Sequence, residues 1–336
     1  MRFSTASTSD PLSEARLNGP LVSIVTPTLN QGRFIEHTIR SIKSQNYRNL
    51  EHIIVDGGSS DETLDVVRRH AGTYPMVWRS EPDHGMYDAI NKGLDLARGD
   101  VLAYLNSDDA YLPWSIESAV DALESAGGVG VVYGDAVTIN DATGDQHLRL
   151  VAPFDRRRLG WSGSLMQPSV FWRRQVMVAH GAFDDGLKYV GDLDYWIRIS
   201  RNVEFAHIDE ILSVERAHAA AHSTASRDAI VLEEQRMRAA HGFDLESADG
   251  QRLRSWARRR EKVFRRKSWL RFLIANFAER SSGPWPCFRA NGRINVSTPR
   301  IIFGQFPRVG DSVLRNAVRS DLAEEVLLGS ESPNGA

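Results

Sequence analysis

Short apolar, β-branched runs alternate with amphipathic segments over the first 140 residues of the chain. Residues 21–26, LVSIVT, resemble a strand buried on both faces of a sheet, and residues 31–45 carry apolar side chains at helical spacing. Strand-like runs recur at 50–56, 76–82, 101–107 and 129–140, with helix-like segments at 60–71, 86–99 and 114–126. Helices between strands supply parallel crossovers, so the pattern predicts an α/β fold with an open, mostly parallel sheet flanked by helices. Pro27 is expected to end the first strand.

The length of 336 residues suits one large domain, or one domain with an appendage. The single cysteine, Cys287, excludes an internal disulfide framework and suits a reducing compartment. No apolar run reaches the length of about 18 residues that a membrane-spanning helix needs. Residues 1–20 lack the apolar core of a secretory signal and are predicted to be a disordered lead-in. These features predict a cytoplasmic protein.

Charge is distributed unevenly along the chain. Residues 251–336 hold 17 Lys or Arg side chains against 7 Asp or Glu, and residues 1–250 hold 24 against 36. An acidic body with a basic tail suggests that the tail faces something anionic. We therefore predict three parts: the lead-in, a catalytic domain at 21–225, and a mostly helical, basic extension at 226–336.

Polar and acidic residues follow four successive strands of the predicted sheet. They are Thr26 and Pro27, then residues 56–61, then residues 83–85, and finally Asp108 and Asp109. Ligands in open α/β sheets bind beyond the carboxyl ends of the strands, where these residues converge. The sequence thus predicts one crevice that binds a ligand.

The pair Asp108–Asp109 follows an apolar run directly. Two adjacent carboxylates repel each other, and a hard divalent cation such as Mg²⁺ or Mn²⁺ would relieve that repulsion. Such a cation usually keeps water and substrate phosphates as its other ligands, which suits an open site that carries a diphosphate. Alternatively, the pair caps the helix that follows.

Two further segments have both a structural and a functional interpretation. Asp56 is either an Asx-turn residue or an acceptor for a nucleobase or a ribose hydroxyl. In residues 80–92, SEPDHGMYDAINK, the side chains of Asp88, Asn91 and Lys92 share one helical face. That face is either a solvated helix start or a ligand contact.

In YVGDLDYWIRI, residues 189–199, two carboxylates precede aromatic side chains. One of Asp192 and Asp194 is expected to cap a helix running from about residue 192 to residue 200. The other could be a general base, because shielding by Tyr195 and Trp196 would raise its pKa toward working pH. A further helix is predicted at 226–240. His207, His218 and His222 have no convincing metal-ligand spacing.

Five segments together resemble the family 2 glycosyltransferases, and most closely bacterial enzymes that build cell-surface polysaccharides. They are VSIVTPTLNQGRFIEHTIRSIKSQ, IIVDGGSSDET, SEPDHGMYDAINKGL, GDVLAYLNSDD and LKYVGDLDYWIRI, and the resemblance covers residues 21–225. It implies a Rossmann-like fold of the GT-A type, a nucleotide-diphosphate sugar donor, a divalent metal and inversion at the anomeric carbon. A glycan or a lipid-linked molecule would be the acceptor.

The resemblance also implies roles for single residues. Asp192 corresponds to the catalytic base, with Trp196 and Arg198 as its supports, and Asp108 and Asp109 to the metal-binding motif. Donor contacts fall on a larger set: Thr26, Pro27, Asn30, Asp56, Asp83, Asp88, Asn91, Lys92, Asp108 and Gln167. Two positions depart from the family pattern. Asn106 stands where many relatives have an aspartate, and Gly191 replaces the acidic neighbour of the base.

Two rival functions remain open at this point. A nucleotide-sugar-binding scaffold would keep the crevice without needing a base. A nucleotidyltransferase would want a glycine-rich, basic phosphate loop after the first strand, where TPTLNQGR offers one glycine and one arginine.

Residues 252–277 hold ten Lys or Arg side chains against one Glu, interleaved with aromatic and aliphatic residues. This segment is either an ordinary helix packed on the catalytic domain or an interfacial helix on the inner face of an anionic membrane. Because the catalytic domain is acidic, no nucleic-acid partner is expected.

Overall fold

The computed structural model describes residues 19–163, 165–221, 227–260 and 262, and the account of the structure concerns these residues. They form a nine-stranded sheet. Its strands are β1 (Val22–Thr28), β2 (Leu50–Asp56), β3 (Met76–Ser80), β4 (Val101–Tyr104), β5 (Ala110–Tyr111), β6 (Val129–Asn140), β7 (Gln146–Arg149), β8 (Val170–Arg173) and β9 (Glu204–Ala217).

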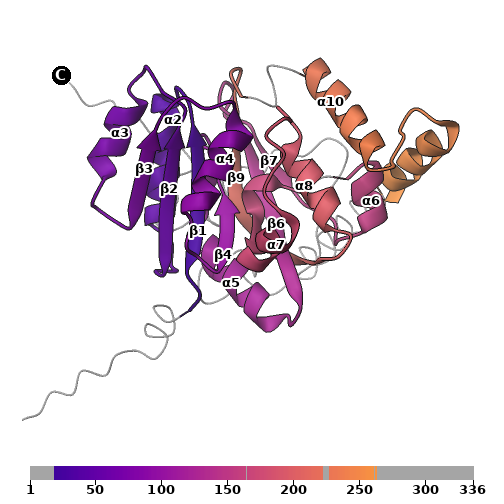
Figure 1. The fold of residues 1–336 in the computed structure, drawn as a ribbon, viewed down its shortest axis with the longest axis horizontal. Helices are drawn as coiled ribbons and strands as arrows, with labels where there is room; N and C mark the ends of the chain where they lie inside the picture. Colours follow the sequence, from indigo (N-terminus) through magenta and orange to yellow (C-terminus); the bar gives the residue numbers. More distant parts are fainter. Residues whose placement is uncertain (1–18, 164, 222–226, 261, 263–336) are drawn as a thin grey trace, which may run out of the picture.

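Strand order in the sheet is β3-β2-β1-β4-β8-β6-β9-β5, with β7 paired to β6. Strands β1 to β4 are parallel, and β6 and β9 run in the same direction as these four. The short strands β5, β7 and β8 run the other way. The sheet is therefore mostly parallel, as predicted (Figure 1). Strand β8 is antiparallel to its two neighbours, β4 and β6.

Helices lie on both faces of the sheet. They are α2 (Gly32–Lys43), α3 (Thr63–His70), α4 (Met86–Leu96), α5 (Ser115–Ser125), α6 (Arg156–Trp161), α7 (Arg174–His180), α8 (Gly191–Ile199) and α10 (Arg227–Ala240), with a 3-10 turn, η1, at Gln167–Ser169. Along β4, Leu102 and Tyr104 pack with Ile90 of α4 and Trp196 of α8. Val101 and Ala103 pack into the other layer. Burial on both faces explains why β4 is a continuous apolar run.

The first half of the chain folds as its periodicity predicts, with one correction. Strand β1 does not end at Pro27 but continues to Thr28. Its pairing with β4 stops at Val25, whereas Pro27 pairs with Val55 of β2. The missing N–H of Pro27 therefore interrupts no ladder with β4.

Beyond residue 150 the sequence pattern was weak, and β7, β8 and β9 were not predicted. Strand β9 is long, but its burial is only partial over most of its length and its pairing with β6 contains register shifts. Such a strand lacks both a clean alternation and a continuous apolar run. The predicted helices at 192–200 and 226–240 are present as α8 and α10.

Helix α10 packs onto the sheet domain through a buried arginine. The Arg238 side chain is 1% exposed and donates to the carbonyl oxygens of Leu159, Gly160 and Gly163 at 2.5–3.0 Å. A second helical stretch covers residues 248–260 (Figure 1). The rest of the predicted basic helix, residues 263–277, lies outside the described residues, as does the predicted lead-in apart from residues 19 and 20. Among the helices described, none combines the length and the apolar character required to cross a membrane.

Candidate active site

The loops after β1 and β2 are joined beyond the strand ends. Asn30 has a positive φ of 52°, which asparagine tolerates better than most residues. Its N–H donates to Ser59 Oγ at 2.7 Å, and its Oδ1 accepts the N–H of Ser60 at 2.8 Å. Asp61 Oδ2 accepts the N–H of Gly32 at 3.0 Å. The two loops form one polar rim.

Two residues predicted to form the nucleoside pocket have side chains that are already engaged. Asp56 is 1% exposed, and its Oδ2 accepts the N–H groups of Gly58 and Ser59 and the hydroxyl of Ser80 at 2.7–3.1 Å. Thr26 is fully buried, with its hydroxyl 2.8 Å from His52 Nε2. Burial lowers the pKa of His52 to about 3, so His52 is neutral. Pro27 is likewise buried within β1. Contacts of these residues with a nucleoside remain predictions.

The segment after β3 lies against the loop after β2. A Cβ on Gly57 would stand 2.5 Å from Asp83 Oδ2, so the Asp83 carboxylate lies directly over Gly57. Asp83 Oδ1 accepts the N–H of Gly85 at 3.0 Å, and Gly85 has a φ of 133°, which favours glycine. Burial raises the pKa of Asp83, with smaller raising contributions from Asp88 and Asp56.

The three residues predicted to share a helical face divide into two groups. Lys92 Nζ lies 3.1 Å from Asp88 Oδ2, beside the loop. The N–H of His84 and this ammonium group lower the pKa of Asp88. The side-chain amide of Asn91 instead makes two hydrogen bonds to the backbone of Phe183. It donates to the carbonyl oxygen at 2.9 Å and accepts the N–H at 3.1 Å. Asn91 thus anchors the loop at Phe183, and its contact with a donor stays a prediction.

Asp108 and Asp109 have different environments. Asp108 Oδ2 lies 2.9 Å from Nε2 of His218, whose ring packs against Phe34 with centroids 4.5 Å apart and planes inclined by 37°. Asp109 is 4% exposed, and its Oδ1 accepts the N–H of Arg216 at 3.0 Å. Burial, followed by the charges of Asp108 and Glu215, raises the pKa of Asp109 well above the usual range. The charge of Asp108 thus adds to the effect of burial on the pKa of Asp109.

Asp108 and His218 together fit a hard divalent cation that arrives with a diphosphate, because such an ion needs few protein ligands. Asp109 fits less well, since it is only 4% exposed, whereas the side chain of Asp108 is 17% exposed. Within the residues that the structure describes, no three His, Cys, Asp or Glu side chains are grouped to hold an ion. His218 was set aside for its lack of a metal-ligand spacing, because 110 positions separate it from Asp108 and β9 was not predicted.

Gln167 lies beside the end of β4. Its Nε2 donates to the carbonyl oxygen of Tyr104 at 2.8 Å, while its Oε1 is buried and makes no hydrogen bond to described residues. The side-chain Oδ1 of Asn106, two positions beyond Tyr104, is likewise buried without a described partner. Two unsatisfied acceptors at one strand end mark a place where a polar ligand would gain hydrogen bonds.

Asp192 lies in the first turn of α8 and is partly buried. Its Oδ1 accepts the hydroxyl of Tyr87 at 3.2 Å. Burial raises its pKa, as a base that takes a proton near neutral pH requires. Tyr87 is only one residue into α4, which starts directly after the Asp83 loop, so the candidate base lies beside the predicted donor loop.

The structure explains Gly191 as well. A Cβ at this position would lie 2.8 Å from the ring of Tyr87, so the space of a side chain is already filled. The phenol that fills it provides the hydrogen bond to Asp192. Tyr87 could not have been found from the sequence, because 105 positions separate it from Asp192.

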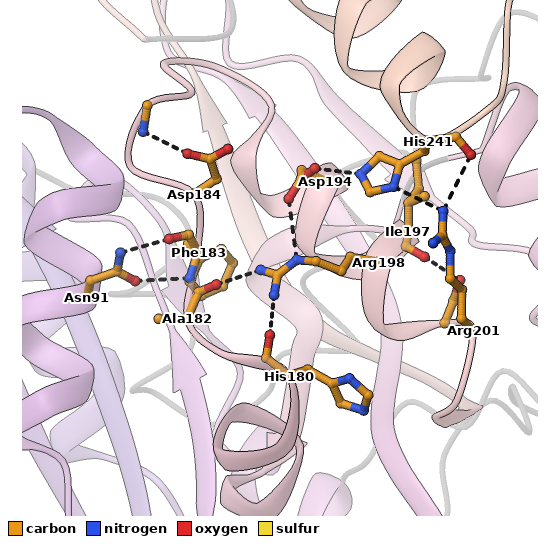
Figure 2. Close-up of polar contacts among 12 residues, drawn as sticks. Asn91, His180, Ala182, Phe183, Asp184, Asp194, Ile197, Arg198, Arg201 and His241 are labelled. Atoms are coloured by element: carbon orange, nitrogen blue, oxygen red, sulfur yellow. Dashed lines mark hydrogen bonds and ion pairs between the residues drawn. The ribbon is translucent and has the colours of Figure 1, made fainter.

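Trp196 and Arg198 fix helix α8 in place. Trp196 is 1% exposed and packs against Trp172, with ring centroids 5.5 Å apart. Arg198 donates to the carbonyl oxygens of His180 and Ala182 and lies 3.7 Å from Asp194 Oδ2 (Figure 2). Asp194 is therefore tied to Arg198, and to His241 at 2.6 Å. Of the two carboxylates in this turn, Asp192 is the one that is hydrogen-bonded to Tyr87, at the start of the helix that follows the Asp83 loop.

Tyr104 lies between the two halves of the site. Burial raises the pKa of its phenol well above the usual range, and the charges of Asp192 and Asp109 add to that effect. The buried phenol of Tyr104 is thus within electrostatic reach of both Asp109 and Asp192.

Comparisons with known proteins define the class. A family model described as Glycosyl transferase family 2 matches residues 23–183. An uncharacterised glycosyltransferase of Mycobacterium tuberculosis is 33% identical over 187 residues, which is 54% of this chain and 69% of that protein. The chain belongs to glycosyltransferase family 2.

Another relative is a PGL/p-HBAD biosynthesis glycosyltransferase of Mycobacterium bovis, 31% identical over 191 residues, which is 54% of this chain and 71% of the relative. Two solved structures share the fold. TarS of S. aureus in complex with UDP-GlcNAc has a TM-score of 0.56 and 17% identity, covering 73% of each chain. The mannosyltransferase PcManGT of Pyrobaculum calidifontis, in complex with GDP-Man and Mn²⁺, has a TM-score of 0.55 and 18% identity, covering 81% of this chain and 78% of that one. The predicted GT-A fold is thereby confirmed.

Proposed function

We propose that this glycosyltransferase is metal-dependent and inverting, and that it moves a sugar from a nucleoside-diphosphate donor to a hydroxyl of a glycan or lipid-linked acceptor. The observation that carries the proposal is the position of Asp192, a partly buried carboxylate with a raised pKa beside the predicted donor loop. The solved structures with UDP-GlcNAc and with GDP-Man support a nucleotide-sugar donor. Relatives named for PGL/p-HBAD biosynthesis support a biosynthetic role.

In the proposed reaction, Asp192 accepts the proton of the acceptor hydroxyl as that oxygen attacks the anomeric carbon. The new carbon–oxygen bond forms on the face opposite the diphosphate, and the old one breaks with its electron pair leaving on the nucleoside diphosphate. Tyr87 holds the carboxylate by its hydrogen bond to Oδ1. General-base help of this kind is worth roughly 10²–10⁴ in rate.

Asp108 and His218 would hold the divalent cation, and Asp83, Asp88 and Lys92 would contact the donor. When bound, such a cation offsets negative charge on a departing diphosphate. The buried acceptors on Asn106 and Gln167 are candidates for hydrogen bonds to donor hydroxyl groups. The family and the geometry of Asp192 both favour sugar transfer over a role as a scaffold or a nucleotidyltransferase.

A panel of nucleotide sugars, including UDP-GlcNAc and GDP-Man, tests the proposal. We expect one donor to bind more tightly with Mg²⁺ or Mn²⁺ than with EDTA, and to release its nucleoside diphosphate in the presence of an acceptor extract. Donor binding that is indifferent to metal, with no release above background, would contradict the proposal.

We also propose contact between the basic extension and an anionic membrane surface. Within residues 248–260, Leu253 and Trp256 are partly buried and Ala257 is fully buried, so the apolar side packs on the protein. The basic side chains Arg258, Arg259 and Arg260 are exposed, and Trp256 lies between Arg157 and Arg260 at 5.3 and 5.2 Å. This arrangement favours electrostatic contact with lipid headgroups. Flotation with anionic vesicles, with and without residues 251–336, tests it, and flotation unchanged by truncation would remove the idea.

A further inference from the structure

Glu233 of helix α10 binds the turn that leads into α8. Glu233 Oε1 accepts the N–H of Lys188 at 2.8 Å, and its Oε2 accepts the N–H groups of Tyr189 and Val190 at 2.6 and 3.0 Å. Three successive amides therefore converge on one carboxylate. Charge-assisted hydrogen bonds of this kind are short and strong, and they fix the turn immediately before Gly191 and Asp192.

This turn also contacts the candidate base, Asp192, through the side chain of Tyr87. The hydroxyl of Tyr87 lies 3.3 Å from the carbonyl oxygen of Tyr189 and 3.2 Å from Asp192 Oδ1. A phenol has only one proton to donate, so the two acceptors compete for it. The position of the Tyr189 carbonyl group therefore determines how strongly Tyr87 holds Asp192.

Glu233 itself belongs to a firmly anchored element. Arg238, one turn further along α10, is buried against the carbonyl groups of α6 and pairs with Glu234 at 2.8 Å. After α10, His241 lies 2.6 Å from Asp194 of α8 (Figure 2). Helix α8 is thus held at two points. Glu233 of α10 binds the turn before α8, and His241, just after α10, binds Asp194 in the first turn of α8.

We propose that Glu233 is a positioning residue for the reaction: it fixes the Tyr189 carbonyl and, through Tyr87, directs the carboxylate of Asp192. The inference rests on the proposed function only in taking Asp192 as the base. The family model matches residues 23–183, and helix α10 lies beyond them. The Glu233 contacts therefore belong to the C-terminal part of the chain.

The titratable groups that face Asp192 are Tyr87 from α4 and Tyr104 from β4. Burial raises the pKa of Asp192, and the hydrogen bond from Tyr87 acts in the opposite direction. Without Glu233 the Tyr189 carbonyl is free to approach the Tyr87 hydroxyl and take a larger share of its proton, so the bond to Asp192 weakens and the pKa of Asp192 rises further. The rate should then begin to fall at a higher pH as the solution is made more acidic. A general loss of folded protein would lower the rate without moving that pH.

The test compares Glu233→Ala, Glu233→Gln, Tyr87→Phe and the double variant Tyr87→Phe/Glu233→Ala, each in the full chain. The matched control is Asp228→Asn, which removes one exposed carboxylate from the same helix. Turnover is measured as release of UDP from UDP-GlcNAc or of GDP from GDP-Man, with donor affinity measured separately. The pKa of Asp192 is followed in the free protein by carboxyl ¹³C NMR, which needs no substrate.

For Glu233→Ala we expect kcat to fall by about 10- to 100-fold, the range that a small misplacement of a reacting group costs, with donor affinity unchanged. Glu233→Gln should recover part of the loss because it keeps an acceptor oxygen, and Asp228→Asn should match the wild type. In the Tyr87→Phe background, Glu233→Ala should cost much less, because both residues act through one contact. Fully additive effects, or an unchanged pKa of Asp192 in Glu233→Ala, would overturn the proposal.

Asp192→Asn separates this inference from the proposed function. If that variant turned over like the wild type, Asp192 would not be the base, whereas the NMR comparison would still show whether Glu233 positions it. If Asp192→Asn were inactive and Glu233→Ala resembled the wild type, only the inference about Glu233 would fail.

Discussion

The two sides of the crevice are built in different ways. On the side of β2, Asp56 is held by Gly58, Ser59 and Ser80, all within 24 positions along the chain. On the side of α8, Asp192 is held by Tyr87, 105 positions away. The first side is a set of self-contained turns, whereas the second depends on elements that only the complete fold brings together.

This difference determines what could be predicted from the sequence. Strands β1 to β4 and the helices between them were predicted because buried parallel strands and amphipathic helices have strong periodic signals. The positions of Asp108 and Asp192 were predicted from motifs that resemble a family. The structure pairs Asp194 with Arg198 and His241, whereas Asp192 accepts a hydrogen bond from Tyr87.

The partners of those residues were not predictable. His218 follows an irregular strand, and Glu233 is one acidic residue among several on a helix. Neither has a spacing that points to its partner. Conversely, the turn interpretation of Asp56, which the sequence left open, matches the contacts that the structure shows for its carboxylate.

The largest expected effect lies on the α8 side. Asp192→Asn should lower kcat by roughly 10²–10⁴, the usual contribution of a general base, while donor affinity stays within about twofold. Burial raises the pKa of Asp192. As the pH decreases, the wild-type rate should therefore begin to fall at a pH above the ordinary pKa range of aspartate. Steady-state kinetics and donor titrations check both points. Turnover within tenfold of the wild type would remove Asp192 from its role.

The next effect compares the two carboxylates of the acid pair. Asp108→Asn should abolish the gain in donor affinity that Mg²⁺ or Mn²⁺ provides, by roughly 10–100-fold or more, because Asp108 is the better placed ligand. Asp109→Asn should keep most of that gain, since Asp109 is bonded to the backbone of Arg216. Calorimetric titration with and without EDTA measures both variants. The reverse ranking would show that Asp109 is the main ligand.

The smallest expected effect is on stability. The pKa of Asp109 is raised by burial and by Asp108, so ionising this carboxylate favours the unfolded state. That cost is absent below the ordinary aspartate pKa of about 3.9 and grows as the pH rises through the folded-state value. Asp109→Asn should therefore raise the Tm at pH 8 more than at pH 5, by roughly 2–4 °C for each kcal/mol removed. Scanning calorimetry checks this prediction, and an equal or lower Tm at both pH values would contradict it.

The central claim is that one carboxylate, Asp192, activates the acceptor hydroxyl for direct displacement of the nucleoside diphosphate. The anomeric configuration of the transferred sugar in the product, determined by proton NMR, tests this most directly. The account predicts a β-linked product from an α-linked donor, because a single attack opposite the leaving group inverts the carbon. An α-linked product would contradict it, since retention requires a second displacement or a same-face attack in which Asp192 has no such role.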